Sequence, residues 1–527
     1  MTKAIRRGDD AGKASVTSDI DDTTDRPWWE TRWFVAAMIL LAFVPLLYPP
    51  VPPLVDLLGH MGRYRVQLDL ATSPYLDQFY AFRWAPIGNL GVDLLTELLA
   101  RIVGLEPAVK LIVLSIPPLT VAGLLWVAYE VHHRLPPTAL FALPFSYSYP
   151  FLFGFTNFAL AMAMALIAFG LWLRLASRGR DRLRAILFVP ISTLIFFTHA
   201  FGWGTLGLLC FSADAVRQHD RGIGWFKAAI NAALQASVML LPLLVMVIWR
   251  SEAHGGDTTD WFNWSAKLVW LKTALRDRWE WLDIASLVAV GLVVAEALRN
   301  PRLTFSRNLA FSALVLIAGF ILLPRIIFGS AYADMRLVPY FIAVLLLAIR
   351  FRGDTSRRLG LALAVLAFAF VGIRLGSNTI SLARAANDQQ AKLQALNHVP
   401  EGARVVSMVG LKCGKSWALP RNSHLGAMVV VRRNGFSNDQ WLMEGLNLLD
   451  LKYRAPGYFA ADPSEIVRPN ACGDRLHLTI DRALKAVPRH AFDYLWLIDP
   501  PTYDPANVAD MKPVWRGPGS ILYRVNP

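Results

Sequence analysis

Three residues in the stretch PPVPPLVDLLGHMGRYR, positions 49–65, combine groups that can move protons and bind anions. Asp56, His60 and Arg63 are spaced at i, i+4 and i+7, which places them on one face of a helix. A carboxylate such as that of Asp56 can remove a proton from a hydroxyl, and His60 can orient it or share the proton. A plain helix with charged surface pairs has the same spacing, so the pattern alone leaves both interpretations open.

The remaining residues of this stretch predict where the helix lies. The prolines end the preceding apolar run, and Pro53 suits the first turn of a new helix. Leucines 54, 57 and 58 occupy the faces that Asp56 and His60 leave free. This division of polar and apolar faces predicts an amphipathic helix lying at the outer membrane interface.

Other polar residues gather at the ends of apolar segments, where their cost marks a candidate site. Arginine can hold a phosphate through paired N–H groups and stabilise charge that develops on it. The sequence therefore predicts phosphate contacts from arginines and a pocket lined by the neighbouring polar residues. The predicted phosphate- and substrate-binding residues are Arg63, Arg83, Asn89, His199, Asp334 and Arg336.

A membrane must position these residues. Of 527 residues, 55% are hydrophobic and only 17% are charged, whereas soluble domains carry about a quarter charged residues. Apolar runs recur that approach or exceed the roughly 17–25 helical residues that a bilayer crossing needs. Eleven spans are predicted, near 33–50, 107–130, 137–152, 156–175, 184–199, 201–216, 226–249, 283–299, 309–328, 337–350 and 359–376.

Basic residues set the predicted orientation. The net charge is +14, and sixteen Lys and Arg residues lie in connections near 134, 174–184, 217–227, 299–307 and 350–358. The short connections near 150–155, 199–202 and 329–335 contain none. Because basic loops stay in the cytoplasm, the N-terminus is predicted inside and the C-terminal region outside. This distribution explains the positive charge without a nucleic-acid partner.

Composition divides the chain into three parts. Residues 1–30 are polar and lack the apolar core of a cleavable signal, which predicts a disordered cytoplasmic tail. Residues 31–376 form the transmembrane domain, with a large first external loop at about 51–106. Residues 377–527 are predicted to form a small periplasmic α/β domain, because short β-branched and aromatic runs there are bounded by Gly, Pro or Asp. The expected strands are ARVVSMVG, AMVVVRR, FDYLWLID and SILYRV, and the expected helical segments are PSEIVRP and LTIDRALKAV.

The three cysteines, and the motifs that the sequence lacks, limit the kinds of site that can be predicted. Cys413 and Cys472 lie in the external domain, where an oxidising compartment would permit a disulfide, although spacing alone does not establish one. No Cys-x-x-Cys or His-Glu-x-x-His pattern occurs, and no glycine loop of the nucleotide-binding kind. No cofactor is predicted as certain, and a divalent cation stays open.

Beyond these patterns, the chain resembles a family. With VDLLGHMGR opening the first external loop, then RWAPIGNLGVDLL, then DMRLVPYF at a late span, it is similar to bacterial membrane glycosyltransferases of the GT-C superfamily. More narrowly, the chain resembles a proteobacterial branch of that superfamily whose activity is not established. It implies sugar transfer from a polyprenyl-phosphate donor to an acceptor outside the inner membrane. It places the catalytic acidic residue at Asp56 and the arginine near the lipid phosphate at Arg336. The first loop lacks an Asp-x-Asp pair, so the resemblance does not decide whether a metal is needed.

The predicted function is therefore glycosyl transfer at the periplasmic face of the bacterial inner membrane. Asp56 is the predicted base with His60 as its partner, and the acceptor is a saccharide, lipid or protein. Two alternatives use the same membrane segments. A transporter or flippase of lipid-linked saccharides would need a polar path through the membrane, and few charges occupy the cytoplasmic halves of the spans. A non-catalytic assembly factor would leave the charged first loop without a role.

The orientation makes a direct prediction. Alkaline phosphatase fused after residue 527 should be active, because the positive-inside rule places the C-terminal domain in the periplasm. Enzyme activity of the fusion in whole cells is the measurement. An inactive fusion beside an active cytoplasmic reporter at the same position would reverse the orientation.

Overall fold

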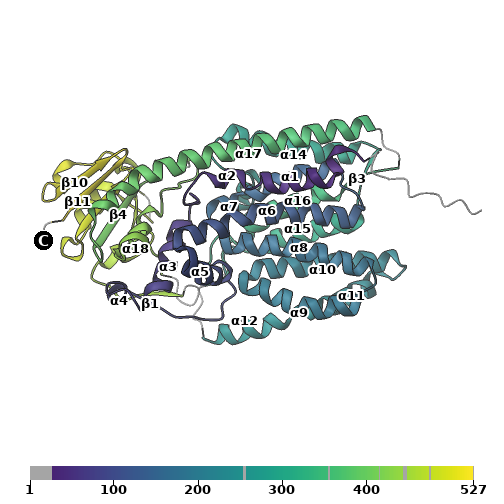
Figure 1. The fold of residues 1–527 in the computed structure, drawn as a ribbon, viewed down its shortest axis with the longest axis horizontal. Coiled ribbons are helices and arrows are strands. Elements are labelled where there is room, and N and C mark those ends of the chain that lie inside the picture. Colours follow the sequence, from purple (N-terminus) through teal and green to yellow (C-terminus); the bar gives the residue numbers. More distant parts are fainter. Residues whose placement is uncertain are drawn as a thin grey trace, which may run out of the picture.

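The computed structural model describes residues 26–252, 257–353, 357–414, 416–442, 448–473 and 476–525. A long bundle of helices ends in a smaller domain built around a sheet, and the first external loop lies between the two (Figure 1). The predicted disordered tail, residues 1–30, lies mostly outside the described residues. The fold is therefore a helical part of the predicted kind with a C-terminal sheet domain.

The helical part contains seventeen α-helices in its described residues. They are α1 (Arg32–Leu41), α2 (Val44–Leu47), α3 (Leu57–Asp69), α4 (Leu76–Phe79), α5 (Gly91–Val103), α6 (Leu105–His132), α7 (Tyr149–Phe153), α8 (Thr156–Ser177), α9 (Asp181–Thr198), α10 (Ala200–Asp220), α11 (Trp225–Ala236), α12 (Leu241–Glu252), α13 (Trp264–Lys272), α14 (Glu280–Arg299), α15 (Arg307–Leu322), α16 (Val338–Ala348) and α17 (Arg357–Leu393). A short two-stranded antiparallel sheet of β2 (Leu303–Phe305) and β3 (Ile349–Phe351) links the connection before α15 to the one after α16.

Few of these helices are both long enough and apolar enough to cross a membrane by themselves. By length and composition, four described helices qualify: α6, α8, α14 and the helix formed by α17 with its 3₁₀ extension to His398. The α11–α12 pair, bent by 66°, makes a fifth if it is one span. The predicted count of eleven spans is not confirmed.

The predicted span at 137–152 differs most from the structure. It is a 3₁₀-helix, Pro137–Tyr147, followed by the short helix α7. Pro144 lies inside it and supplies no backbone N–H for a continuous α-helix. Every residue of this 3₁₀-helix is buried, so the segment packs inside the bundle, against α6, α16 and α17.

The predicted interfacial helix exists, but its location was wrong. Helix α3 carries His60 and Arg63, yet Leu57, Leu58 and Met61 are almost fully buried. The C-terminal domain covers one side of α3, and α5 and α6 cover the other. In the first loop, helix α5 has an exposed apolar face, since Leu98 is 67% exposed.

The C-terminal domain contains a seven-stranded mixed sheet in the order β10-β11-β9-β4-β7-β8, with β5 also paired to β4. Its strands and helices are β4 (Arg404–Gly410), α18 (Met428–Arg433), β5 (Phe436–Ser437), β7 (Ile466–Arg468), β8 (Leu478–Thr479), α19 (Ile480–Ala486), β9 (Tyr494–Ile498), β10 (Lys512–Gly517) and β11 (Ser520–Arg524). The strands β5, β7 and β9 all run parallel to β4.

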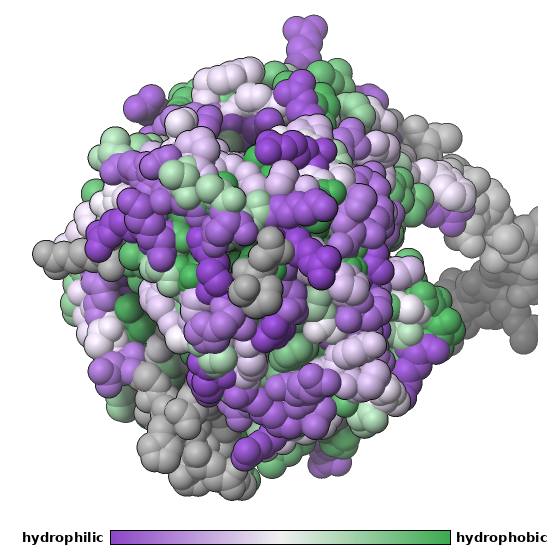
Figure 2. Space-filling model, turned by 90° about the vertical axis from the view of Figure 1, so that its left-hand side faces the viewer, coloured by the Kyte–Doolittle hydropathy of each residue, from purple (hydrophilic) through white to green (hydrophobic). Residues whose placement is uncertain are grey.

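Most of the predicted segments of this domain are confirmed. The exceptions are AMVVVRR, which forms α18 instead of a strand, and PSEIVRP, which contains β7 instead of a helix. Both are short apolar runs, for which periodicity does not separate a buried helix from a buried strand. Figure 2 shows the end of the molecule that this domain forms, where hydrophilic residues dominate the surface, as a water-facing domain requires.

The domain and the first loop are joined by a shared sheet. Strand β1 (Tyr80–Phe82) of the loop pairs antiparallel with β6 (Leu449–Leu451) of the domain. Helix α17 also runs without interruption through the predicted boundary at residue 377. The predicted pair Cys413–Cys472 forms a disulfide, with Cα atoms 5.8 Å apart, which confirms the hypothesis.

Buried ion pairs connect the helices to the domain. Arg374 of α17 donates to Asp283 of α14 at 2.6 Å and to the carbonyl of Leu275 at 2.8 Å. Asp283 also accepts a hydrogen bond from the Trp417 indole of the domain at 2.7 Å. The side chains of Arg374 and Asp283 are at most 2% exposed, so this contact is shielded from water and salt.

This network predicts a large loss of stability. Arg374→Met leaves the carboxylate of Asp283 buried without its cation, which typically costs about 3–5 kcal/mol of unfolding free energy. SDS titration of detergent-solubilised protein measures it. Arg101→Met is the control, because Arg101 pairs with Glu97 in solvent, at 68% exposure, and should change the unfolding free energy little. Equal effects of the two substitutions would contradict the prediction.

Candidate active site

Asp56 lies where the first loop, the helical bundle and the C-terminal domain meet. It precedes α3, and its backbone N–H donates to the carbonyl of Phe153 at 2.8 Å. Gly154 makes this close approach possible, because a Cβ there would lie 2.7 Å from the Asp56 nitrogen. The Asp56 side chain is 15% exposed, so its carboxylate is nearly enclosed by protein but still reachable.

His424 of the C-terminal domain is the partner of Asp56. Its Nε2 lies 3.7 Å from Asp56 Oδ1, and its Nδ1 lies 2.5 Å from Asp439 Oδ1. The imidazole therefore bridges two carboxylates, one from each part of the molecule. His60, the predicted partner, packs instead against Trp441 and Tyr64, with ring centroids 4.9 and 6.4 Å away.

This arrangement shifts two pKa values. Burial raises the pKa of Asp56 to about 7, although the charges of His424 and Arg336 oppose the rise. Burial lowers the pKa of His424, but Asp439 and Asp56 outweigh it and raise that pKa to about 9. A carboxyl that titrates near neutrality thus lies beside an imidazole that holds its proton.

A gap in the sheet makes room for the acidic residues around His424. Strand β5 pairs with the start of β4 and β7 with its end. Between them the Asn438 side chain accepts from the Ser407 N–H at 2.8 Å and donates to the Ser407 carbonyl at 3.2 Å. Asp439 follows Asn438, Glu465 precedes β7, and both are fully buried.

These residues include the candidate metal ligands. Ligand atoms of His424, Asp439 and Glu465 all lie within 4.8 Å of one another. Imidazole and carboxylate groups are suitable ligands for several divalent cations. Within the described residues, this is the one group of three such side chains that close together.

Arg336 is the cation on the membrane side of the site. It is 7% exposed, and its guanidinium carbon lies 4.7, 5.3 and 5.8 Å from the ring centroids of Phe155, Phe201 and Phe158. Its Nη2 reaches the Ser330 hydroxyl at 3.4 Å, and its Nε has no hydrogen-bond partner among the described residues. The aromatic rings stabilise the charge while leaving donors available for an anion.

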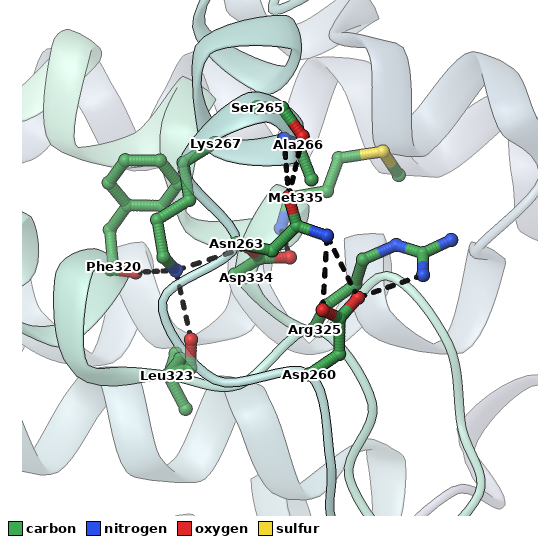
Figure 3. Close-up of polar contacts among 10 residues, drawn as sticks. All are labelled: Asp260, Asn263, Ser265, Ala266, Lys267, Phe320, Leu323, Arg325, Asp334 and Met335. Atoms are coloured by element: carbon green, nitrogen blue, oxygen red, sulfur yellow. Dashed lines mark hydrogen bonds and ion pairs between the residues drawn. The ribbon is translucent and has the colours of Figure 1, made fainter.

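A buried ion pair holds the turn that carries Arg336. Lys267 of α13 donates to Asp334 at 3.2 Å and to the carbonyls of Phe320 and Leu323 at 2.7 and 2.9 Å. Figure 3 shows these contacts converging on the Lys267 amine, with the Asp260–Arg325 pair beside them. Asp334, a predicted pocket residue, is therefore engaged with Lys267, two positions before Arg336.

The structure places the other predicted site residues in supporting positions. Arg63 forms a buried ion pair with Asp93. Arg83 is exposed, and its backbone N–H donates to the Leu448 carbonyl at 2.9 Å. The carbonyl of Asn89 accepts a hydrogen bond from Asn157.

His199 caps α10. Its Nδ1 accepts from the Phe201 N–H at 3.1 Å, and its ring contacts Phe158, one of the aromatic residues around Arg336. Of the predicted site residues, the structure thus brings Asp56, Arg336 and His199 to one region.

Sequence reasoning missed His424, Asp439 and Glu465. His424 lies three residues before AMVVVRR, which was predicted to be a strand, and Glu465 lies in PSEIVRP, which was predicted to be helical. A usable signal was the polar run NDQ, positions 438–440, directly after β5. Their approach to Asp56 depends on domain docking, which no local pattern reports.

In comparisons with known proteins, the overall arrangement of the chain is distantly similar to that of solved structures. No family model matches the chain, and no curated protein does. The chain is similar to the crystal structure of ArnT from Cupriavidus metallidurans bound to undecaprenyl phosphate, with 12% identity and a TM-score of 0.48 over 94% of this chain and 97% of that one. It is similar to the apo state of the same protein with 14% identity and a TM-score of 0.47 over the same shares. At these values the chemistry of this chain has to be argued from its own side chains.

Proposed function

We propose that the protein transfers a sugar from a polyprenyl-phosphate-linked donor to an acceptor at the periplasmic face of the bacterial inner membrane. One observation carries the proposal. A nearly buried carboxylate, Asp56, and a buried guanidinium with unused donors, Arg336, flank the same site at the end of the helical bundle. The resemblance of the first-loop and late-span motifs to GT-C glycosyltransferases supports the same reaction.

The two charges have complementary tasks in such a transfer. The acceptor oxygen gives its proton to Asp56 and forms a bond to the anomeric carbon of the donor sugar. The bond from that carbon to the phosphate oxygen breaks, and its electron pair stays on the lipid phosphate. Arg336 stabilises the negative charge that develops there, in an environment where water is largely excluded.

His424 orients the base. Asp439 holds its Nδ1, which directs the Nε2 edge toward Asp56. Such a carboxylate–histidine–carboxylate series fixes ring orientation in the way that the third member of a catalytic triad does. The C-terminal domain thus contributes directly to the site, and the acceptor enters between it and the first loop.

The lipid tail of the donor belongs on the bundle side of the site. Phe155, Phe158 and Phe201, which surround Arg336, belong to the α8 and α10 region. An apolar wall beside a phosphate-binding cation matches a polyprenyl phosphate, which is apolar apart from its headgroup. A transport function would require neither a base nor an orienting histidine at this position.

Asp56→Asn should abolish most transfer while leaving the fold and donor binding intact. The substitution keeps the shape of the side chain and removes its basicity, and a positioned general base typically contributes about a hundred- to ten-thousand-fold in rate. Release of polyprenyl phosphate from lipid-linked sugars, in proteoliposomes supplied with lipids of the source organism, measures transfer.

Two acidic residues of the same loop are matched controls. Asp69 pairs with Arg65, and Asp77 pairs with Lys452 at the surface, so Asp69→Asn and Asp77→Asn should transfer nearly normally. Loss in Asp69→Asn with normal transfer in Asp56→Asn would move the base to Asp69. Normal transfer in all three variants would show that none of these first-loop carboxylates is the base.

Arg336→Met should weaken binding of undecaprenyl phosphate and slow transfer by on the order of a hundredfold or more, as loss of one oxyanion-stabilising donor does. Arg336→Lys should recover part of the binding, because it restores the charge without the paired donors. Native mass spectrometry of the detergent-solubilised protein measures lipid binding. Arg101→Met is the control, and unchanged binding in Arg336→Met would contradict the assignment.

A further inference from the structure

The gap between β5 and β7 encloses a carboxyl group that has no cationic partner among the described residues. Glu465 is fully buried, and the hydrogen-bond contacts of its carboxyl group are with its own backbone and with Asp462, another acid. It faces the imidazole of His424 and the carboxylate of Asp439, with ligand atoms within 4.8 Å of each other. Burying a carboxyl group without a cationic partner is costly, so this side chain requires an explanation.

The charges around Glu465 point to a cation. Asp439 and Asp462 add further acidic groups beside Glu465. Asp56 lies on the other side of His424. Four carboxyl groups thus lie around one imidazole, and a single protonated histidine cannot balance them if they are ionised.

We propose that His424, Asp439 and Glu465 bind a divalent cation in the split edge of the C-terminal sheet. One imidazole nitrogen and two carboxylate oxygens match the preferences of Zn²⁺ and Mn²⁺. The cation takes the place of the proton between His424 Nδ1 and Asp439. It also supplies the cationic partner that Glu465 lacks.

The position of the site gives the cation a defined role. With Nδ1 bound to the cation, His424 keeps a proton on Nε2 and donates it toward Asp56, 3.7 Å away. A metal-bound histidine commonly donates its second N–H to a carboxylate, which orients both groups. This role rests on the proposed function, whereas binding of the cation depends only on the three ligands.

Metal binding is tested on the full-length protein in detergent. The protein is stripped with EDTA and dialysed against Zn²⁺ or Mn²⁺, and bound metal is measured by inductively coupled plasma mass spectrometry. One equivalent per chain and a higher melting temperature than in EDTA are expected. Metal at background level in the wild-type protein would overturn the proposal.

Variants locate the site and separate it from the transfer function. Glu465→Gln, which keeps the side-chain shape, should bind at least tenfold less tightly, and it should melt like the wild-type protein in EDTA if it is folded. The control is Glu401→Gln, an exposed glutamate of the same domain, which should keep one equivalent. Equal retention by Glu465→Gln and the wild-type protein would place the metal elsewhere and overturn the proposal.

Asp56→Asn lies outside the three ligands and should keep its metal while losing transfer. Metal binding that depends on Glu465, in a protein without any transfer activity, would refute the proposed function and leave the cation site standing. Transfer that depends on Asp56, in a protein that binds no metal, would support the proposed function and refute the cation site.

Discussion

One buried guanidinium links the C-terminal domain to both the first loop and the helical bundle. Arg421 donates to the carbonyl of Pro53 and to the carboxylate of Asp277, both at 2.5 Å. Asp277 also accepts from Ser381 of α17 at 2.9 Å. The contact therefore joins the residues before Asp56, the connection before α14 and the domain. His424 lies three positions after Arg421, so the same contact brings the imidazole to Asp56.

The docked parts place a positive charge on one side of Asp56 and acidic groups on the other. The bundle contributes Arg336, and the domain contributes Asp439, Asp462 and Glu465 around His424. In a buried environment such charges act over several ångströms with little screening. An anionic leaving group is thus favoured on the bundle side, and a proton or a metal cation is favoured on the domain side.

Arg336 keeps donors available for the proposed anion because its surroundings are mostly aromatic rings rather than hydrogen-bond acceptors. Aromatic rings stabilise a cation through their faces without consuming its N–H donors. The turn that carries Arg336 is held by other residues, since Lys267 and Asp334 form a buried pair two positions earlier. Lys267 and Asp334 thus fix the position of the turn, whereas Arg336 supplies the charge. A substitution of Arg336 need not disturb the Lys267–Asp334 pair.

Local sequence patterns determined several parts of this protein. Apolar runs identified the helical part, and β-branched runs identified β4, β9 and β11. The sequence offered Cys413 and Cys472 as a possible pair, and the structure shows that they are bonded. The prolines before Asp56 and the arginine in DMRLVPYF marked two residues of the site, because costly polar groups at apolar segment ends are visible without a structure.

Only the tertiary structure decided which groups meet. His60 lies one helical turn from Asp56, yet the histidine that faces the carboxylate is His424, which lies 368 positions along the chain from Asp56. Arg63 was free to bind phosphate by its spacing, but it is committed to Asp93. Spacing reports neighbours along a helix, whereas these pairs arise from the docking of a separate domain and from the split edge of its sheet. These pairs are stabilised by contacts between segments that lie far apart in the sequence. Neither segment contains a local pattern that identifies its partner.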